Sequence, residues 1–234
     1  MAEEHIGDNI KRVREKIARA ALEAGRNHAD IKLMAVTKTV PTADILTAIS
    51  AGVTLIGENR VQELLLKNDS LSQAGAEIHL IGHLQGNKVS KIIGKAAMIQ
   101  SVDSIQIASE IDKRSEQACL VTDILVEVNI AGQKSKSGFA PEQTLEAIDE
   151  ISHFRSIRVK GMMTIPPIGE NSLETRRYFS AMRRLFVDIS GKKIDNVNCK
   201  ILSMGMSGDF VEAVLEGSTM VRIGSAIFGA RQYI

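Results

Sequence analysis

The segment IKLMAVTKTVPTADILTAISAGVTLIG, residues 31–57, contains the repeating unit that decides the fold. Its opening, residues 31–38, is an apolar run rich in branched side chains, which predicts a buried strand. Thr42 can cap a helix over residues 43–51, and residues 53–57 predict a second strand. A strand, a helix and another strand in close succession are typical of a sheet whose strands run parallel.

The same alternation continues along the rest of the chain. Further strands are predicted at residues 77–82, 96–102, 123–130, 157–165, 197–204 and 219–224. Helices are predicted at residues 59–73, 87–95, 104–117, 141–153, 173–189 and 207–216. Eight strands, each but the last followed by a helix, predict an α/β fold that is a single closed (β/α)₈ TIM barrel. An open doubly wound sheet is the alternative, but it usually has fewer strands.

An additional helix is predicted before the first strand. Apolar residues recur there at spacings of three and four, at Ile6, Ile10, Val13 and Ile17. This spacing predicts an amphipathic helix over about residues 6–25, outside the barrel or across its lower mouth. No linker or shift in composition marks a boundary, so we expect one domain over residues 1–234 with the barrel at about 31–231.

Composition excludes several classes of function. The net charge of +1 and the 3% aromatic content, with no Trp, argue against a nucleic-acid partner. Cys119 and Cys199 have no CxxC neighbour, so we expect neither a metal site nor a disulfide framework. The N-terminus does not resemble a signal peptide, and no apolar stretch is long enough for a membrane span. We therefore expect a cytoplasmic protein with no membrane partner.

Lys38 is the first candidate functional residue. It ends the first predicted strand, on the same face as Met34 and Val36. Apolar surroundings favour the neutral amine, which is the form that attacks a carbonyl group. The alternative is that Lys38 is an ordinary lysine where a strand meets solvent.

Other polar residues stand at the ends of the predicted strands. In a parallel barrel these ends meet at one face, which carries the active site. Polar groups on apolar strands are costly unless they are used. The set comprises Glu58, Asn59, His83, Asn129, Thr164, Ser203 and Arg222, with Met163 and Gly224 beside them.

The segment LSMGMSGDF, residues 202–210, predicts a phosphate site. Its small residues precede a predicted helix whose first turn carries Ser207 and Asp209. Backbone N–H groups and the positive end of that helix suit a phosphate. Gly224 and Ser225 would supply the second half of the site, from the loop after the last strand. The alternative is ordinary capping by Ser207 and a plain turn at Gly224.

Four further candidates have structural alternatives. Arg222 could form a buried ion pair with Glu127. Asn59 could have no role other than capping a helix. His83 could be an ordinary hydrogen-bonded histidine at a strand end. Met163, with the neighbouring Met162, is expected to line the barrel. A lysine nucleophile and a phosphate site on one face fit two ligands, a sugar phosphate in an aldolase or pyridoxal 5'-phosphate (PLP).

Motifs along nearly the whole chain resemble one family. AVTKT, GENRVQE, HLIGHLQGNK, SVDS, VNIAGQKSKSGF, KGMMTIP and LSMGMSGDFVEAVLEGSTMVRIGSAIFG, in this order, are similar to the pyridoxal phosphate homeostasis proteins, also called proline synthase co-transcribed homologues. The resemblance implies a barrel like the N-terminal domain of alanine racemase (PLP fold type III), without the racemase's second domain. One departure is Arg60, where the family usually has an aromatic residue. This departure leaves open how the rim of the pocket is built.

The resemblance also implies the roles of individual residues. PLP would form a Schiff base with Lys38, Arg222 would lie near the pyridine nitrogen and Asn59 would line the cofactor. The phosphate would be held by Ser203, Gly205, Met206, Ser207, Gly224 and Ser225.

Three functions are compatible with these residues. The first is a monomeric, non-catalytic protein of intracellular PLP homeostasis, which holds the cofactor and has PLP-dependent apoenzymes as candidate recipients. The second is a PLP-dependent amino-acid racemase, which needs an acid opposite Lys38. Tyr178 and Tyr233 are poorly placed for that role, so His83 would have to substitute, and we expect no significant turnover. The third is an aldolase, with Lys160 as its alternative lysine.

Overall fold

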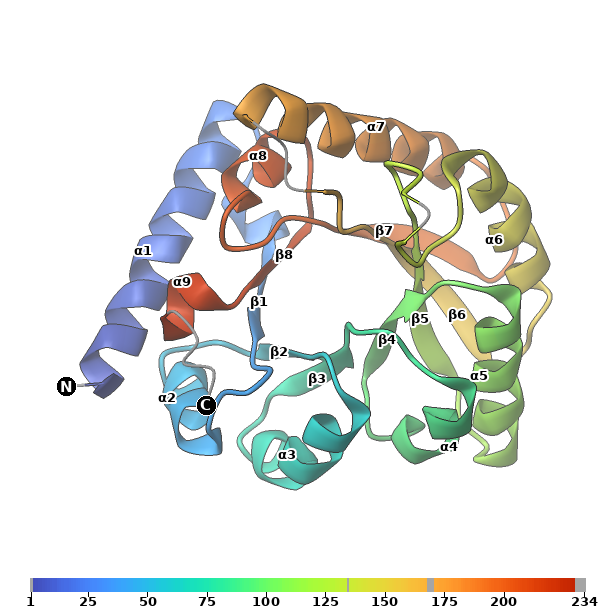
Figure 1. Cartoon of the computed structure of the whole chain (residues 1–234), viewed down its shortest axis with the longest axis horizontal. Helices are drawn as coiled ribbons and strands as arrows, with labels where there is room; N and C mark the ends of the chain where they lie inside the picture. Colours follow the sequence, from blue (N-terminus) through green and yellow to red (C-terminus); the bar gives the residue numbers. More distant parts are fainter. Residues whose placement is uncertain (1, 134, 168–170, 230–234) are drawn as a thin grey trace.

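The computed structural model describes residues 2–133, 135–167 and 171–229, with only the backbone of residues 2–4. Eight parallel strands pair in sequence order, and the last pairs with the first, which closes the barrel (Figure 1). The predicted (β/α)₈ barrel is thus confirmed. The strands are β1 (Lys32–Val36), β2 (Leu55–Glu58), β3 (Glu77–Leu80), β4 (Met98–Val102), β5 (Thr122–Glu127), β6 (Ile157–Met163), β7 (Val197–Ser203) and β8 (Met220–Ile223).

Helices surround the barrel on its outside (Figure 1). They are α1 (Ala2–Glu23), α2 (Thr42–Ser50), α3 (Val61–Gln73), α4 (Val89–Ile92), α5 (Ile105–Gln117), α6 (Thr144–Ser152), α7 (Ser172–Ser190), α8 (Phe210–Leu215) and α9 (Ser225–Phe228). Short 3₁₀ turns are η1 (His28–Asp30), η2 (Gly86–Lys88) and η3 (Pro141–Gln143).

The N-terminal helix α1 lies outside the barrel and not across its mouth. It packs against α2, α8 and α9, along the left edge of the view in Figure 1. The predicted apolar stripe, Ile6, Ile10, Val13 and Ile17, is buried in this contact. Burial of one apolar face explains why this helix is stable beside the barrel.

Two details of the local prediction are wrong. Thr42 does not cap α2: it is the first residue of the helix, and Pro41 occupies the cap position. The helix predicted over residues 207–216 begins only at Phe210, after Asp209. The Asp209 carboxylate accepts a hydrogen bond of 2.5 Å from the Met206 N–H, which holds residues 206–209 in a turn before the helix. A short helix after the last strand, α9, was not predicted.

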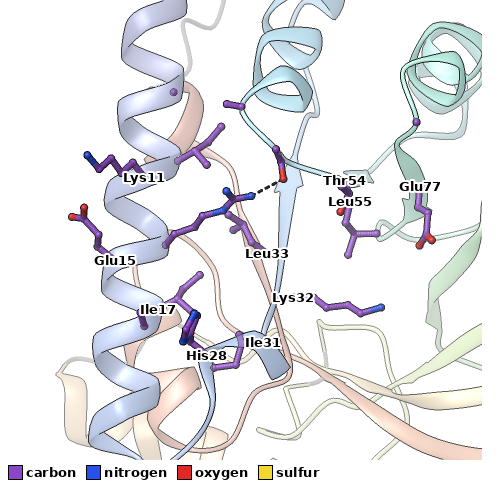
Figure 2. Close-up of a pocket in the computed structure, with 17 residues that line it drawn as sticks. Lys11, Glu15, Ile17, His28, Ile31, Lys32, Leu33, Thr54, Leu55 and Glu77 are labelled. Carbon is purple, nitrogen blue, oxygen red and sulfur yellow. Dashed lines mark hydrogen bonds between the residues drawn. The ribbon is translucent and has the colours of Figure 1, made fainter.

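The barrel buries apolar residues on both sides of its wall. Alternate residues of each strand point to the lumen and to the helices. Figure 2 shows this for β1, where Lys32 and Leu33 extend to opposite sides of the strand. Inside the lumen, one cluster contains Met34, Leu55, Ile81 and Met220, and another contains Met98, Leu125 and Met163. The sequence predicts that Met162 and Met163 of β6 both line the barrel. Met163 does lie in the lumen, whereas Met162 packs in the outer core.

Two exclusions made from the sequence can be compared with the structure. Within the described ranges, no helix has the length and apolar character needed to cross a membrane. In the same ranges, no group of three His, Cys, Asp or Glu side chains is arranged to hold a metal ion.

Candidate functional site

Lys38 lies in a turn just after β1, and not within the strand as predicted. The strand ends at Val36, and Thr39 has a left-handed backbone with φ of 62°. Both neighbours of Lys38 are held by α3. The Thr37 carbonyl accepts a hydrogen bond from Lys67 Nζ at 2.8 Å, and the Thr39 N–H donates to Glu63 Oε2 at 2.7 Å. The backbone on each side of Lys38 is therefore fixed.

These contacts belong to a group of side chains that we call the Lys67 cluster: the buried Thr37, Glu58 and Lys67, and the partly exposed Glu63. Lys67 Nζ lies 2.8 Å from Glu58 Oε1 and 3.1 Å from Glu63 Oε2. The Thr37 hydroxyl donates to the same Glu58 oxygen at 2.5 Å. Sequence reasoning missed Lys67 and Glu63, although their spacing of four residues on a predicted helix is typical of an ion pair.

Burial makes the charges of the Lys67 cluster depend on one another. Glu58 is fully buried, and this burial raises its pKa, while hydrogen bonds from Lys67 and Thr37 act to lower it. Burial also acts to raise the pKa of Glu63, but the hydrogen bonds from Thr39 and Lys67 outweigh it, so the pKa is lowered. A buried lysine with two carboxylates is stable only as a complete set.

Arg222 lies inside the lumen, near the carboxyl ends of the strands, and is almost fully buried. Its Nη1 donates to Ser203 Oγ at 2.7 Å, and its Nη2 donates to the Thr164 carbonyl at 2.9 Å. Burial lowers its pKa to about 10, and Glu127 and Asp209 act to raise it. The guanidinium is therefore charged at neutral pH.

Glu127 interacts with Arg222 through space and not in a close ion pair. No ion pair among the described residues joins the two side chains. Burial raises the pKa of Glu127 to about 7, Asp103 adds to this effect, and Arg222 and His83 oppose it. The predicted alternative of a buried Arg222–Glu127 ion pair is not what the structure shows.

The loops after β7 and β8 are joined to each other, as a binding site built from both requires. Ser207 Oγ accepts hydrogen bonds from the Gly224 N–H at 3.1 Å and the Ala226 N–H at 3.2 Å. The Gly205 carbonyl accepts one from the Arg222 N–H at 2.9 Å. The alternative in which Ser207 caps the helix after β7 is wrong, because its hydroxyl oxygen binds the loop after β8.

This pair of loops has unused hydrogen-bond donors and little room for side chains. The N–H groups of Ser207, Gly208 and Ser225 donate to no other residue in the described part of the chain. Gly205 has φ of 93°, and a Cβ atom there would lie 2.5 Å from the Cβ of Ala213. Unused backbone donors on two joined loops suit an anion.

Asn59 does not cap α3, whose cap residue is Arg60. Its Oδ1 atom is buried and has no hydrogen-bond partner within the described ranges. A Cβ on Gly82 would lie 2.2 Å from the Asn59 carbonyl oxygen, so the ends of β2 and β3 approach closely. An unsatisfied buried amide oxygen at a strand end is costly and is consistent with a binding role.

His83 and Lys160 match their structural alternatives. His83 Nδ1 lies 2.9 Å from Asp103 Oδ2, and the His83 side chain is 59% exposed. Lys160 Nζ lies 3.8 Å from Asp123 Oδ2, in the middle of β6 and away from the strand end. The aldolase alternative on Lys160 therefore has no support from the geometry.

A large groove lies away from these residues. It has a volume of about 690 Å³ and runs between α1 and the start of β1, next to His28, Ile31 and Leu33 (Figure 2). Lys32 and Glu77, which begin β1 and β3, also line it. The groove is thus at the amino ends of the strands, whereas Lys38, Asn59 and Arg222 are at the carboxyl ends.

Comparison with known proteins shows the family. The sequence model described as "Alanine racemase, N-terminal domain" matches residues 4–232. The chain is 41% identical to the pyridoxal phosphate homeostasis protein of Aquifex aeolicus, over 97% of this chain and 98% of that protein.

Solved structures agree with this assignment. An unknown protein from Bifidobacterium adolescentis is 38% identical, with a TM-score of 0.93 over 97% of this chain and 96% of that one. PipY from Synechococcus elongatus, solved with PLP bound, is 28% identical, with a TM-score of 0.83 over 96% of this chain and 100% of that one. The chain therefore belongs to the pyridoxal phosphate homeostasis protein family.

Proposed function

We propose that this protein binds PLP and serves PLP homeostasis inside the cell, without significant turnover. The observation that carries the proposal is the pair of joined loops after β7 and β8, with unused N–H donors, at the same end of the barrel as Lys38. The similar barrel of PipY was solved with PLP bound, which supports the choice of ligand.

The residues at this end of the barrel fit the chemical groups of PLP. Bound PLP supplies an aldehyde that condenses reversibly with amines, and a pyridine ring that can withdraw electrons. Lys38 is the amine that would hold the aldehyde. The N–H groups of Ser207, Gly208 and Ser225 would bind the phosphate, with Gly205, Met206 and Gly224 shaping the loops. The free Oδ1 of Asn59 would line the cofactor.

The hydroxyl of Ser203 has a different place in this arrangement. It is fully buried and accepts a hydrogen bond from Arg222. The predicted contact between Ser203 and the phosphate stays a prediction. The hydrogen bond from Arg222 supports a role for Ser203 in holding that arginine in place.

Arg222 favours a carrier over an enzyme. Its charged guanidinium would face the pyridine nitrogen and so oppose a second positive charge there. A ring without that charge withdraws electrons less strongly, which slows bond breaking at an attached amino acid.

A racemase would need a second proton-transfer group on the side opposite Lys38. Tyr178 lies on α7, outside the barrel wall, and Tyr233 lies outside the described residues. Two candidates for an acid stand at the strand ends: the His83–Asp103 pair and Glu127, the last residue of β5, whose pKa is about 7. The racemase alternative therefore depends on His83 or Glu127.

We propose that the protein works in the cytoplasm as a monomer, with apoenzymes that use PLP as its candidate recipients. Homeostasis of a reactive aldehyde requires only that it be held and released. A site with a lysine and phosphate donors is sufficient for this task.

The test is to load the purified protein with PLP, record its absorption spectrum and treat it with borohydride. We expect a visible absorption band that borohydride removes, with the modified peptide containing Lys38. Lys38→Ala should remove the band, whereas Lys160→Ala should retain it. A borohydride-reducible band that persists in Lys38→Ala would show that another lysine holds the cofactor.

A further inference from the structure

A chain of buried polar side chains crosses the lumen below Arg222. Ser203 Oγ donates to Gln100 Oε1 at 2.8 Å, and Gln100 Nε2 lies 2.9 Å from His79 Nδ1. Gln100 and Ser203 have no exposed surface, and His79 is 3% exposed. Two clusters of methionine, leucine and isoleucine also line the lumen, so the polar groups of this chain depend on one another for hydrogen bonds.

The direction of each hydrogen bond follows from the guanidinium, which can only donate. Arg222 donates to Ser203, so the serine proton is free to go to the Gln100 oxygen. The Gln100 amide nitrogen then faces His79 Nδ1 and the sulfur of Met220, at 3.2 Å, and donates to both. His79 Nδ1 must accept, so its proton is on Nε2. That nitrogen lies 3.9 Å from Glu77 Oε2.

We propose that Gln100 is a positioning residue that holds the guanidinium of Arg222 in place through Ser203 and keeps His79 in the Nε2-protonated form. Its relevance to the cofactor rests on the proposed function, in which Arg222 faces the pyridine nitrogen. The second anchor of Arg222 is the Thr164 carbonyl. Two anchors at different angles fix a planar guanidinium, and loss of one lets it rotate.

The surroundings of His79 agree with a neutral ring. Burial lowers the pKa of His79, Glu77 and Asp123 act to raise it, and Lys32 acts to lower it. Arg158 and Lys160 pair with Asp123 and offset its charge. A proton on Nδ1 would face the Gln100 amide N–H₂ and break the chain.

The first arm of the test uses the protein without PLP. We expect long-range ¹H–¹⁵N spectra at neutral pH to show His79 with its proton on Nε2, the signal being assigned with His79→Gln. Gln100→Glu should move the proton to Nδ1 or charge the ring, because a carboxylate cannot donate. A wild-type His79 that is charged or protonated on Nδ1 would overturn the proposed chain.

The second arm compares PLP with its 1-deaza analogue, which has a CH group in place of the ring nitrogen. Gln100→Met keeps the side-chain length but removes the hydrogen bonds to Ser203, His79 and Met220. We expect it to change the ratio of the two dissociation constants at least threefold. Gln100→Glu should keep the wild-type ratio, because it still accepts from Ser203. The exposed Gln106→Met is the matched control, expected to leave the ratio unchanged.

The outcomes separate this proposal from the proposed function. An equal weakening of both ligands in Gln100→Met would indicate general damage and overturn the positioning role. If the wild-type protein binds no PLP, the proposed function fails, and the His79 spectra still decide whether the chain exists. If Gln100→Met does not fold, the ratio of dissociation constants can be compared between Gln100→Glu and Ser203→Ala. Only Ser203→Ala loses the contact with Arg222, so only that variant should change the ratio.

Discussion

At the scale of single residues, the candidate site depends on charges that are buried together. The Lys67 cluster holds the backbone on both sides of Lys38 through hydrogen bonds to Thr37 and Thr39. Thr39 has a left-handed backbone, which costs about 1–3 kcal/mol for a residue other than glycine. The bond from its N–H to Glu63 compensates for part of this cost.

We expect Lys67→Met to destabilise the fold by about 3–5 kcal/mol, because it leaves the buried Glu58 carboxylate unpaired. Denaturant unfolding measures this free energy. The double variant Lys67→Met with Glu58→Gln should recover part of the loss, since no unpaired charge remains on Glu58. Exposed Lys91→Met is the control, with a change within about 0.5 kcal/mol. A small effect of Lys67→Met would contradict the role of the cluster.

Glu127 should make stability depend on pH. Its pKa is about 7 in the folded protein and 4.5 ordinarily, so the folded state binds more protons between these values. The stabilisation is present below pH 4.5 and is lost as the pH rises through 7. As the pH rises from 4.5 to 8, the unfolding free energy of Glu127→Gln should therefore increase by roughly 1–3 kcal/mol relative to that of the wild-type protein. Parallel curves of unfolding free energy against pH for the two proteins would contradict the shift.

At the scale of elements, the proposed phosphate site combines the loop after β7 with the start of α9, and it does not use the start of α8. Helix α8 begins at Phe210, and Asp209 already accepts the Met206 N–H, with a carboxylate that would repel an anion. The donors that remain are backbone N–H groups of Ser207, Gly208 and Ser225. Ser207 Oγ ties the two loops together.

PLP should bind much more tightly than pyridoxal, because backbone donors to a charged phosphate make stronger hydrogen bonds than neutral pairs do. Ser207→Asp should weaken PLP binding more than tenfold and affect pyridoxal less. Exposed Ser72→Asp, on α3, is the control for the added charge. Equal affinities for PLP and pyridoxal in titrations of the wild-type protein would show that the loops do not bind the phosphate.

The loop after β7 should not tolerate a side chain at Gly205. Its φ of 93° and the 2.5 Å separation of an added Cβ from Ala213 predict strain. We expect Gly205→Ala to lower the unfolding free energy by about 1–3 kcal/mol and to weaken PLP binding. Gly208→Ala is the matched control, because nothing lies within 4 Å of a Cβ there. The same stability for both variants would be evidence against a strained loop.

At the scale of the whole molecule, the question is whether the barrel only holds PLP or also uses it. Alanine racemase shares the barrel, as the match to its N-terminal domain shows. A shared fold does not establish a shared reaction, since activity depends on the groups at the site. The structure places Lys38 and the His83–Asp103 pair at the carboxyl ends of the strands.

We expect the PLP-loaded protein to show no significant incorporation of solvent deuterium at the α-carbon of L-amino acids. The assay is mass spectrometry or NMR over a panel of amino acids, with Lys38→Ala as the control. Rapid exchange that requires Lys38 and yields the D-isomer would make the protein a racemase. Loss of that exchange in His83→Phe would then identify His83 as the second proton-transfer group.

The barrel could be predicted from the sequence because its signals are local. Apolar runs and amphipathic helices alternate eight times, and each is visible within a short window of residues. Lys38, Asn59 and Arg222 could be selected because polar residues at the ends of apolar strands are unusual. The helix start at Phe210 could not be predicted, because Ser207 and Asp209 are equally good cap residues and only their hydrogen bonds distinguish them.

The sequence by itself determined the order of the elements, the closed barrel and the candidate lysine, since hydrophobic period and strand ends are properties of neighbouring residues. Only the tertiary structure decided which distant side chains meet. Lys67 reaches the carbonyl of Thr37, thirty residues away, and Arg222 connects to His79 through Ser203 and Gln100. Burial, pKa and hydrogen-bond direction depend on such contacts between remote segments, and they arise only when the barrel closes.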